Sequence, residues 1–502
     1  MILRWYTDRV TPSAARAIEF LADALGAQAR LVENLAEAVL VHTARRPEWM
    51  QGIWVRRADS LPPVDHFEAV IDGAVHQLAQ DGRTIVLHDD VLAVAAAILD
   101  GDAERALPAN RHGVPLLAGP EAVAGLLRRP VLSELAQAFA HALQSRVRDF
   151  SARIPRWPAG KSAALMLTHD VDMPYRRPRS DFYLRRLARS VRGASISDGV
   201  RAMGGWLNAR RRHGRSLPVG EDANFGFRFW QDLERSLGGR GCFYVAVRSA
   251  CARDGHPQDV PYRAQDPEVV AAMRTAVEAG WEIGLHASIA CQAEPERFLE
   301  ERAMLERLIG VPVRGVRHHF WALRPGAPEH TWRAQDAAGF AYDSSLGSND
   351  APGFRRGLAW PFIPNGTGLL QVPPTLMDGG LFYTGPEPAE GRAAIRRHLQ
   401  TVFGLGGAAV LDWHLEQSNP TRLHGAGPAL VDALDAVRAR GDIWVTTPSD
   451  AADWWRHRAA LRAALGRTRD RIRLALRPSV PPASAERRAA PEARTRRSST
   501  QP

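Results

Sequence analysis

The chain has 502 residues, of which 45% are hydrophobic, so it is long enough for two or three domains with buried cores. Its net charge of +10 is concentrated in two arginine-rich segments, 176–215 and 456–502, which carry +10 each and leave the remainder at −10. The basic charge therefore does not by itself indicate that the folded body binds nucleic acid.

Cysteine usage and the N-terminus narrow the class of protein further. The three cysteines are odd in number and lack C-x-x-C spacing, which argues against a disulfide framework and against a thiolate metal site. We expect Cys242 to lie buried in a strand. Asp8 and Arg9 fall where a secretory signal needs its apolar core, and the longest apolar run, Val91 to Leu99, is too short to span a bilayer. These features predict a soluble, cytoplasmic protein.

Residues 1–155 are expected to form a small accessory α/β domain. Apolar runs such as Ala38 to Val41 and Thr84 to Leu87 are typical of strands, and a helical spacing of apolar residues runs from Leu132 to Val147. The histidines of this region are isolated, so it contains no catalytic constellation. A linker rich in proline and glycine follows, from Pro155 to Gly160.

A second domain is expected over 160–457, beginning with the stretch A-A-L-M-L-T-H-D-V-D from Ala163 to Asp172. Its apolar run is typical of a strand that is buried on both faces in a parallel sheet. Side chains alternate along a strand, so Asp170 and Asp172 point to one face and His169 to the other. The two carboxylates would meet at the carboxyl end of the strand, where α/β proteins build active sites. The alternative is that they only cap a turn or the next helix.

The basic insert at 176–215 contains twelve arginines and two aspartates. From Phe182 to Val191 its apolar residues recur at helical spacing with arginines between them. A basic amphipathic helix of this kind can lie on an anionic membrane surface. A solvated excursion over the rim of the domain explains the pattern equally well.

Beyond Gly241 the pattern alternates between strand and helix, which predicts a parallel sheet closed as a (β/α) barrel of seven or eight strands. The later strands are expected at Cys242–Val247, Trp281–His286, Val313–His319, Phe340–Ser344, Leu369–Val372, Ala408–Trp413 and Ile443–Thr446. The helices between them are expected at Asp266–Gly280, Pro295–Ile309, Pro328–Ala338, near Glu390–Phe403 and at Pro428–Arg440. The basic tail 467–502 is predicted to be disordered.

Polar side chains occur at the ends of most of these strands, which is typical of a site at the carboxyl face of a barrel. They are His286, Arg317, His319, Asp343 and His414. Aspartate and histidine without cysteine suit a divalent metal ion, with zinc first among several. His318 should face away from Arg317 and His319, and Arg317 could instead pair with a buried carboxylate such as Asp343.

Five segments resemble the motifs of the polysaccharide deacetylase family, the NodB-homology group or carbohydrate esterase family 4. They are T-H-D-V-D, G-L-H-A-S, G-V-R-H-H-F-W, G-F-A-Y-D-S-S and L-D-W-H, in the order of the family, over about 162–455. Together with L-L-Q-V-P-P-T-L-M-D, they resemble a branch that carries an extra N-terminal domain. The resemblance implies a divalent metal, an acetylated glycan substrate and a NodB-like barrel.

The resemblance also implies roles for individual residues. Asp170 would be the general base, oriented by Arg317, and His414 would protonate the leaving group. Asp172 and His286 would hold the metal. We expect contacts to the substrate within the same segments, from Asp343, Trp321 and Asp378.

Two departures from the family pattern bear on the metal site. Val171 separates two aspartates that are adjacent in the family, and Ala290 stands where the family has a second histidine ligand. We expect His319 to be the third ligand, because it lies at a strand end and shares the face of Arg317; His169 is the alternative. Without a third ligand, a degenerate protein would be expected.

The function predicted from the sequence is a metal-dependent hydrolase that removes acetyl groups from an amino sugar or polysaccharide intermediate. The main alternative is a catalytically degenerate deacetylase-like protein that binds glycan or a membrane surface. Nucleic-acid binding through the two arginine-rich segments is a third hypothesis, but they lack the interleaved aromatic residues of a stacking platform. We expect the protein in the cytoplasm, with 176–215 as the candidate contact to the inner membrane.

Overall fold

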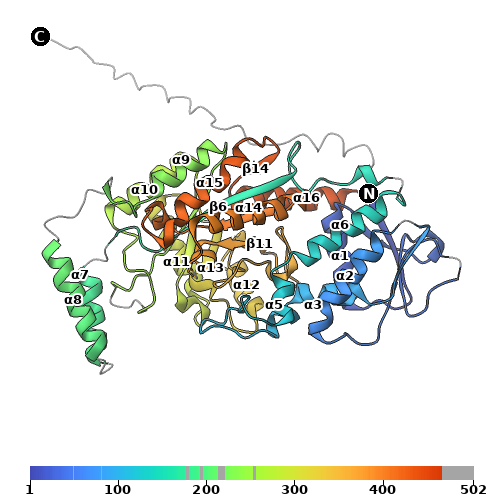
Figure 1. Ribbon diagram of the computed structural model, residues 1–502, viewed down its shortest axis with the longest axis horizontal. Coiled ribbons are helices and arrows are strands. Elements are labelled where there is room, and N and C mark those ends of the chain that lie inside the picture. Colours follow the sequence, from blue (N-terminus) through green and yellow to red (C-terminus); the bar gives the residue numbers. More distant parts are fainter. Residues whose placement is uncertain are drawn as a thin grey trace, which may run out of the picture.

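The computed structural model describes residues 1–465 except 49, 81, 148, 177–179, 193–195, 213–220, 253–255 and 384. The predicted disordered tail, 467–502, lies outside the described residues. Two parallel sheets form the protein, a smaller one near the N-terminus and a larger one that follows it in the chain (Figure 1). The described residues include no helix that is long and apolar enough to cross a membrane.

The N-terminal part is a five-stranded parallel sheet in the order β2-β1-β3-β4-β5. Its strands are β1 (Ile2–Thr7), β2 (Gln28–Leu31), β3 (Leu40–Thr43), β4 (Gly52–Arg56) and β5 (Thr84–Leu87). Its helices are α1 (Pro12–Leu25), α2 (Phe67–Leu78), α3 (Val91–Asp100), α4 (Asp102–Arg105), α5 (Ala122–Leu127) and α6 (Val131–Gln144). Figure 1 shows α1, α2 and α6 between this sheet and the larger part of the molecule.

Helix α1 illustrates how the local sequence sets its own limits. The side chain of Thr11 accepts a hydrogen bond from the backbone N–H of Ala14, and Pro12 occupies the first turn. The helix ends at Gly26, which is left-handed with φ 65°. A Cβ at this position would lie 1.9 Å from the carbonyl oxygen of Ile154, so only glycine allows the chain after α6 to approach so closely.

The larger sheet contains nine parallel strands, with the path β11-β10-β9-β8-β7-β6-β13-β12 and β14 paired to β6. The strands are β6 (Ala163–Val171), β7 (Cys242–Val245), β8 (Glu282–Ala287), β9 (Gly315–His318), β10 (Tyr342–Asp343), β11 (Leu370–Gln371), β12 (Leu376–Met377), β13 (Ala408–Asp412) and β14 (Ile443–Val445). All nine residues of β6 are buried, as its continuous apolar run predicts, and Cys242 is buried in β7.

One segment joins the two ends of this sheet. At its start β11 pairs with β10, and Val372 N–H donates to the Asp343 carbonyl over 2.8 Å. At its end β12 pairs with β13, and Thr375 N–H donates to the Val410 carbonyl over 2.9 Å. Pro373 and Pro374 lie between and have no N–H, so they interrupt the ladder. The segment fills the last position of the ring, which confirms the predicted (β/α) barrel of seven or eight strands with a smaller N-terminal α/β part.

The barrel helices are α9 (Phe227–Ser236), α10 (Pro267–Glu278), α11 (Arg297–Ile309), α12 (Pro328–Ala337), α13 (Asp378–Phe382), α14 (Pro388–Gly404), α15 (Ala426–Arg438) and α16 (Pro448–Ala464). The sequence did not indicate β12, because a two-residue strand after two prolines has no periodicity to detect. The basic insert forms two helices, α7 (Ser180–Arg192) and α8 (Ile196–Arg212), which project from the body in Figure 1.

The two parts share an extensive buried contact. A single hydrophobic cluster includes Leu132 of α6 and Leu358 of the barrel part, both fully buried. Glu104 is 6% exposed and pairs with Arg355 over 2.6 Å between Glu104 Oε2 and Arg355 Nη2. The positions of the domain boundaries, at 155–160 and near 457, stay predictions.

Candidate active site

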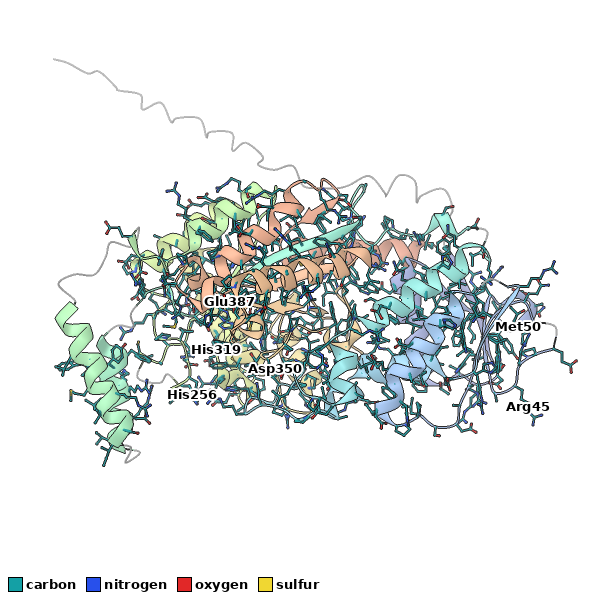
Figure 2. The ribbon with its side chains drawn as sticks, viewed as in Figure 1. Arg45, Met50, His256, His319, Asp350 and Glu387 are labelled. Carbon is teal, nitrogen blue, oxygen red and sulfur yellow. The ribbon has the colours of Figure 1, made fainter. Side chains whose placement is uncertain are left out.

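The polar side chains predicted from the strand ends converge at one end of the barrel. Asp172 follows β6, His286 lies in β8, His319 follows β9 and His414 follows β13. The strands are parallel and adjacent or nearly so, so their carboxyl ends meet at a common edge. Figure 2 shows His319 inside the barrel part, far from Arg45 and Met50 of the N-terminal part.

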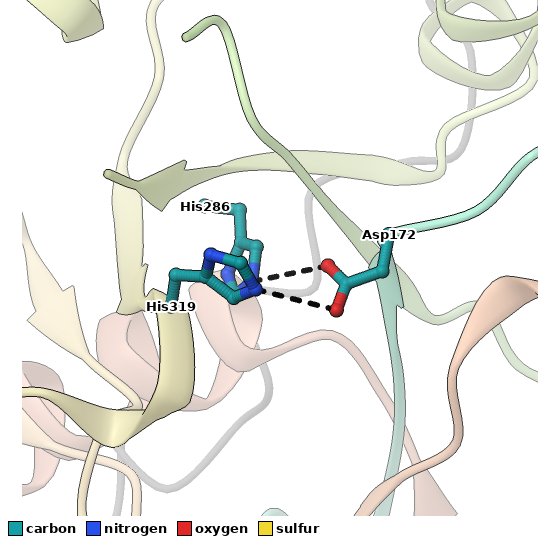
Figure 3. Close-up of side chains that lie close together, drawn as sticks. All are labelled: Asp172, His286 and His319. Atoms are coloured by element: carbon teal, nitrogen blue, oxygen red, sulfur yellow. Dashed lines mark ion pairs between the residues drawn. The ribbon is translucent and has the colours of Figure 1, made fainter. Parts of the chain in front are cut away.

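Asp172, His286 and His319 lie close enough together to share a metal ion. Asp172 Oδ1 is 3.4 Å from His286 Nε2, and Asp172 Oδ2 is 3.5 Å from His319 Nε2 (Figure 3). Ligand atoms of all three residues lie within 4.8 Å of one another. The structure therefore brings together the three residues predicted as ligands, with two nitrogens and a carboxylate directed at one point.

Buried polar atoms without a hydrogen-bond partner test whether a cation fits between Asp172, His286 and His319. His286 Nδ1 lies 3.1 Å from the carbonyl oxygen of Arg317, so Nδ1 carries a proton, and Nε2 carries the lone pair when the ring is neutral. Nε2 of His286 and Oδ1 of Asp172 are both buried and have no hydrogen-bond partner among the described residues. Two unsatisfied buried acceptors are costly unless a cation or a donor occupies the space between them. The donor set fits a divalent ion such as zinc.

The carboxylates and imidazoles of this cluster shift one another's pKa values. Burial alone would raise the pKa of Asp172, but the attraction of the nearby imidazoles of His319 and His286 holds it well below its usual range. Burial would lower the pKa of His286, yet the carboxylates of Asp170 and Asp172 raise it. The Asp172 carboxylate is thus kept ionised, which is the form that binds a metal.

Arg317 is fully buried and joins two carboxylates beside this cluster. Its Nη1 lies 2.8 Å from Oδ1 of Asp170 and 2.8 Å from Oδ1 of Asp412. Its Nη2 donates to Thr168 Oγ1 over 2.8 Å and to Ser344 Oγ over 2.9 Å. The guanidinium is therefore fixed by four groups and holds Asp170 in one orientation.

Asp170, Asp412 and His414 form a second group with ligand atoms within 4.8 Å. The Arg317 guanidinium already supplies a cation to both carboxylates at hydrogen-bond distance, so a second metal would have to compete with it. Burial, together with the negative charge of Asp170, raises the pKa of Asp412 to about 7. This arrangement favours proton transfer by Asp412 over the binding of a second metal ion.

His414 is oriented by Asp378. Its backbone N–H donates to Asp378 Oδ2 over 2.7 Å, and its ring Nδ1 donates to Asp378 Oδ1 over 3.0 Å. Its Nε2 lies 3.7 Å from Asp172 Oδ2 and so faces the metal cluster. Burial would lower the pKa of His414, but Asp378 raises it well above the ordinary value. The structure gives Asp378 a positioning contact to His414, where the sequence predicted contact with the substrate.

A pocket of about 470 Å³ opens over these groups and is lined by Asp172, His319 and His414. Asp259 and Glu416 also line it, and each has a buried carboxylate oxygen with no partner among the described residues. Burial raises the pKa of Glu416 to about 7. A pocket of this size, with several acceptor oxygens, can hold a polyhydroxylated ligand of one or two sugar rings.

Several predicted site residues lie outside this pocket. Asp343 is fully buried, and its carboxylate accepts hydrogen bonds from Ser345 and Gln335, so Arg317 does not pair with it. Trp321 is 3% exposed and lies over the Arg317 guanidinium, with 5.2 Å between the guanidinium carbon and the ring centroid. Both side chains therefore lie behind the groups that line the pocket. Neither lines the pocket itself, where the sequence predicted contacts with the substrate.

The histidines on the opposite strand faces behave as side-chain alternation predicts. His169 lies 3.0 Å from Glu234 and stacks on Trp230, so it is not available as the third ligand. His318 packs edge-on against Phe298, and burial lowers its pKa to about 3. Of the two candidates for the third ligand, only His319 reaches the cluster.

Sequence reasoning missed Asp412, Asp259 and Glu416. Asp412 could have been found, because it ends a strand two residues before His414 and thus shares its face, by the alternation that identifies Asp170 and Asp172. Asp259 lies in a loop and Glu416 in a four-residue 3-10 helix, Leu415–Ser418, so neither belongs to a periodic pattern that would indicate the direction of its side chain.

The N-terminal part reaches the metal cluster through a stack of three rings. His112 lies parallel to Phe320, with 4.4 Å between ring centroids and an interplanar angle of 3°. Phe320 in turn stacks on His319 at 4.0 Å and 17°. Phe320 is left-handed, with φ 57°, a conformation that costs a non-glycine residue about 1 kcal/mol or more and needs support from its surroundings. The stack fixes the plane of the His319 ring, whose Nε2 faces Asp172.

We expect His112→Ala to weaken metal binding about ten-fold, because it frees Phe320 and thereby His319. His112→Phe should keep the stack and nearly the parental affinity. Zinc titration of both purified variants, monitored by calorimetry, measures the difference. Equal affinities in the parent and the alanine variant would contradict a positioning role.

Comparison with protein-family models gave no match, and comparison with curated proteins gave none. Among solved structures, a protein named as a polysaccharide deacetylase from Mycobacterium smegmatis is 21% identical, with TM-score 0.41 over 60% of this chain and 93% of that one. A protein named likewise from Pseudomonas aeruginosa PAO1 is 16% identical, with TM-score 0.39 over 61% and 95%. PuuE allantoinase is 16% identical, with TM-score 0.37 over 61% and 95%.

Proposed function

We propose that this protein is a metal-dependent hydrolase that removes acetyl groups from an amino sugar or polysaccharide intermediate. The observation that carries the proposal is the cluster of Asp172, His286 and His319, with its buried acceptor atoms that lack a partner among the described residues. Asp172 and His319 line a pocket that is also lined by His414. A divalent ion at this cluster would supply a polarised acyl carbonyl and a water of lowered pKa. The resemblance of the five sequence motifs supports the same reaction class.

The remaining groups account for the proton transfers of hydrolysis. Asp170, oriented by Arg317 over 2.8 Å, would accept a proton from the attacking water. Addition of that water to the acetyl carbon, followed by cleavage of the bond to nitrogen or oxygen, releases acetate. His414, charged because of Asp378, would give its proton to the departing amine or alkoxide. Asp259 and Glu416 would accept hydrogen bonds from hydroxyl groups of the sugar.

The experiment that tests this proposal is acetate release from acetylated chito-oligosaccharide by the purified chain, with added zinc and after treatment with a chelator. The proposal expects release that depends on the metal and is restored when zinc is returned. Stoichiometric metal binding without release from this or other acetylated glycans would favour the degenerate, glycan-binding alternative. No metal binding after addition of zinc would overturn the proposed site itself.

Asp378→Asn is expected to move the alkaline limb of the pH profile of kcat to lower pH. In the parent, Asp378 raises the pKa of His414, so the acid form persists until the pH rises through that elevated value. Asparagine removes the negative charge, the pKa of His414 falls, and the acid form is lost at a lower pH. Initial rates from about pH 5 to 10 measure the shift.

The control for this variant is Asp435→Asn, which makes the same change on the exposed face of α15. It should leave the profile unchanged. An alkaline limb that does not move in Asp378→Asn would exclude His414 as the acid in the rate-limiting step.

A further inference from the structure

The basic insert forms an antiparallel helical hairpin whose two helices meet through small residues. Gly199 of α8 faces Ser190 of α7, and Gly205 faces the ring of Tyr183. Ala202, which lies between the two glycines along α8, is fully buried. The spacing 199, 202 and 205 places these residues on one side of α8, and this side packs against α7.

The aliphatic residues of α8 lie on another side and are exposed. Ile196, Val200, Met203 and Leu207 are 84%, 67%, 40% and 43% exposed. Their spacing of i, i+4, i+7 and i+11 forms a single stripe along the whole helix. Leu184 and Val191 of α7 add two further exposed side chains, at 46% and 74%. No described residue covers this stripe.

The hairpin holds an unusual share of the exposed apolar surface. Fourteen large hydrophobic side chains are exposed among the described residues, and these six belong to one short hairpin while the other eight are scattered over the body. Isolated exposed apolar residues are normal, whereas an ordered stripe indicates a surface that something covers.

The charge of the segment identifies the kind of partner. Over 176–215 the sequence has twelve arginines and two aspartates, and one of these, Asp198, already pairs with Arg186 and Arg201. A second copy of the same hairpin would bring two segments of +10 together, which like-charge repulsion opposes. An anionic surface with an apolar interior matches both the arginines and the stripe.

We propose that the α7–α8 hairpin docks on an anionic lipid bilayer, with the stripe of Ile196, Val200, Met203 and Leu207 entering the acyl-chain boundary. The net charge of +10 over 176–215 attracts the segment to lipid phosphates at the headgroup level. The hairpin is held to the body by Arg185, which donates from Nε to the carbonyl of Cys251 over 2.8 Å. This docking does not depend on the proposed hydrolase activity.

The test is co-sedimentation of the full chain with vesicles of phosphatidylcholine alone or mixed equally with phosphatidylglycerol. The double variant Ile196→Asp/Val200→Asp places charge in the stripe without touching the helix contact. Leu299→Asp is the control, because Leu299 is an aliphatic residue that is 60% exposed on a helix of the barrel. Light scattering of each protein without lipid gives the oligomeric state.

The proposal expects binding to the anionic vesicles only, weakened at least about ten-fold by the double variant and unaffected by Leu299→Asp. Binding that the double variant does not weaken would overturn the role of the stripe. Absence of binding to anionic vesicles would overturn the proposal. A dimer in the parent that the double variant converts to a monomer, without vesicle binding, would assign the stripe to a second copy instead.

Discussion

Replacing Asp172 with alanine is expected to abolish both metal binding and acetate release. Among the described residues, Asp172 is the carboxylate that groups with both His286 and His319, and its two oxygens face one histidine each, at 3.4 and 3.5 Å. Its removal leaves two neutral nitrogens without a charged ligand. The metal affinity should fall at least about 100-fold, more than loss of an outer-shell partner costs. The rate should fall roughly 10³-fold or more, because a bound metal contributes several kcal/mol to catalysis.

Elemental analysis and the shift of Tm on addition of zinc measure this prediction without relying on activity. Zinc should raise the Tm of the parent, because it binds the folded state, and should leave the variant unchanged. Asp59→Ala is the control, since the side chain of Asp59 is 98% exposed on the N-terminal part. A variant that retains zinc and its thermal shift would place the metal elsewhere.

The barrel could be predicted from the sequence because its strands and helices carry clear local signals. The core of β6 is a continuous apolar run. Among the later helices, α10 begins with Pro267, and α11 ends at the left-handed Gly310. The eight predicted barrel strands all occur. For the N-terminal sheet, the sequence indicated only some of the strands. Strands such as β2, whose residues are partly exposed, have no apolar alternation to detect.

Alternation along strands also predicted which side chains of the site share a face. It placed Asp170 with Asp172, and Arg317 with His319, and directed His169 and His318 away. It could not predict contacts that depend on distant loops. The bond from Asp378 to His414 spans 36 residues, and the His112 stack comes from another part of the chain. Such contacts arise from tertiary packing, which no local period encodes.

Removing the guanidinium of Arg317 is expected to produce the largest loss of stability. Arg317→Met keeps the volume of the side chain but leaves Asp170 and Asp412 buried without their cation. Breaking a buried ion pair by removing one partner costs about 3–5 kcal/mol. Arg314→Met is the control, since Arg314 makes an equally close bond of 2.7 Å to Asp453 but on the surface, where such pairs contribute less than about 1 kcal/mol.

The sign of the pH dependence distinguishes a lost charge pair from a packing defect. Burial and the charge of Asp170 already raise the pKa of Asp412 to about 7, and Arg317 opposes this rise, so the pKa of Asp412 in the folded variant should be higher still. The destabilisation should therefore be full at high pH and diminish as the pH falls through this raised pKa. Adding Asp412→Asn to Arg317→Met should likewise restore part of the lost free energy of unfolding. Urea denaturation of the parent, Arg317→Met and the double variant between about pH 5 and 9 measures both effects. If the loss in free energy of unfolding is independent of pH and is not relieved by Asp412→Asn, Arg317 acts through packing alone.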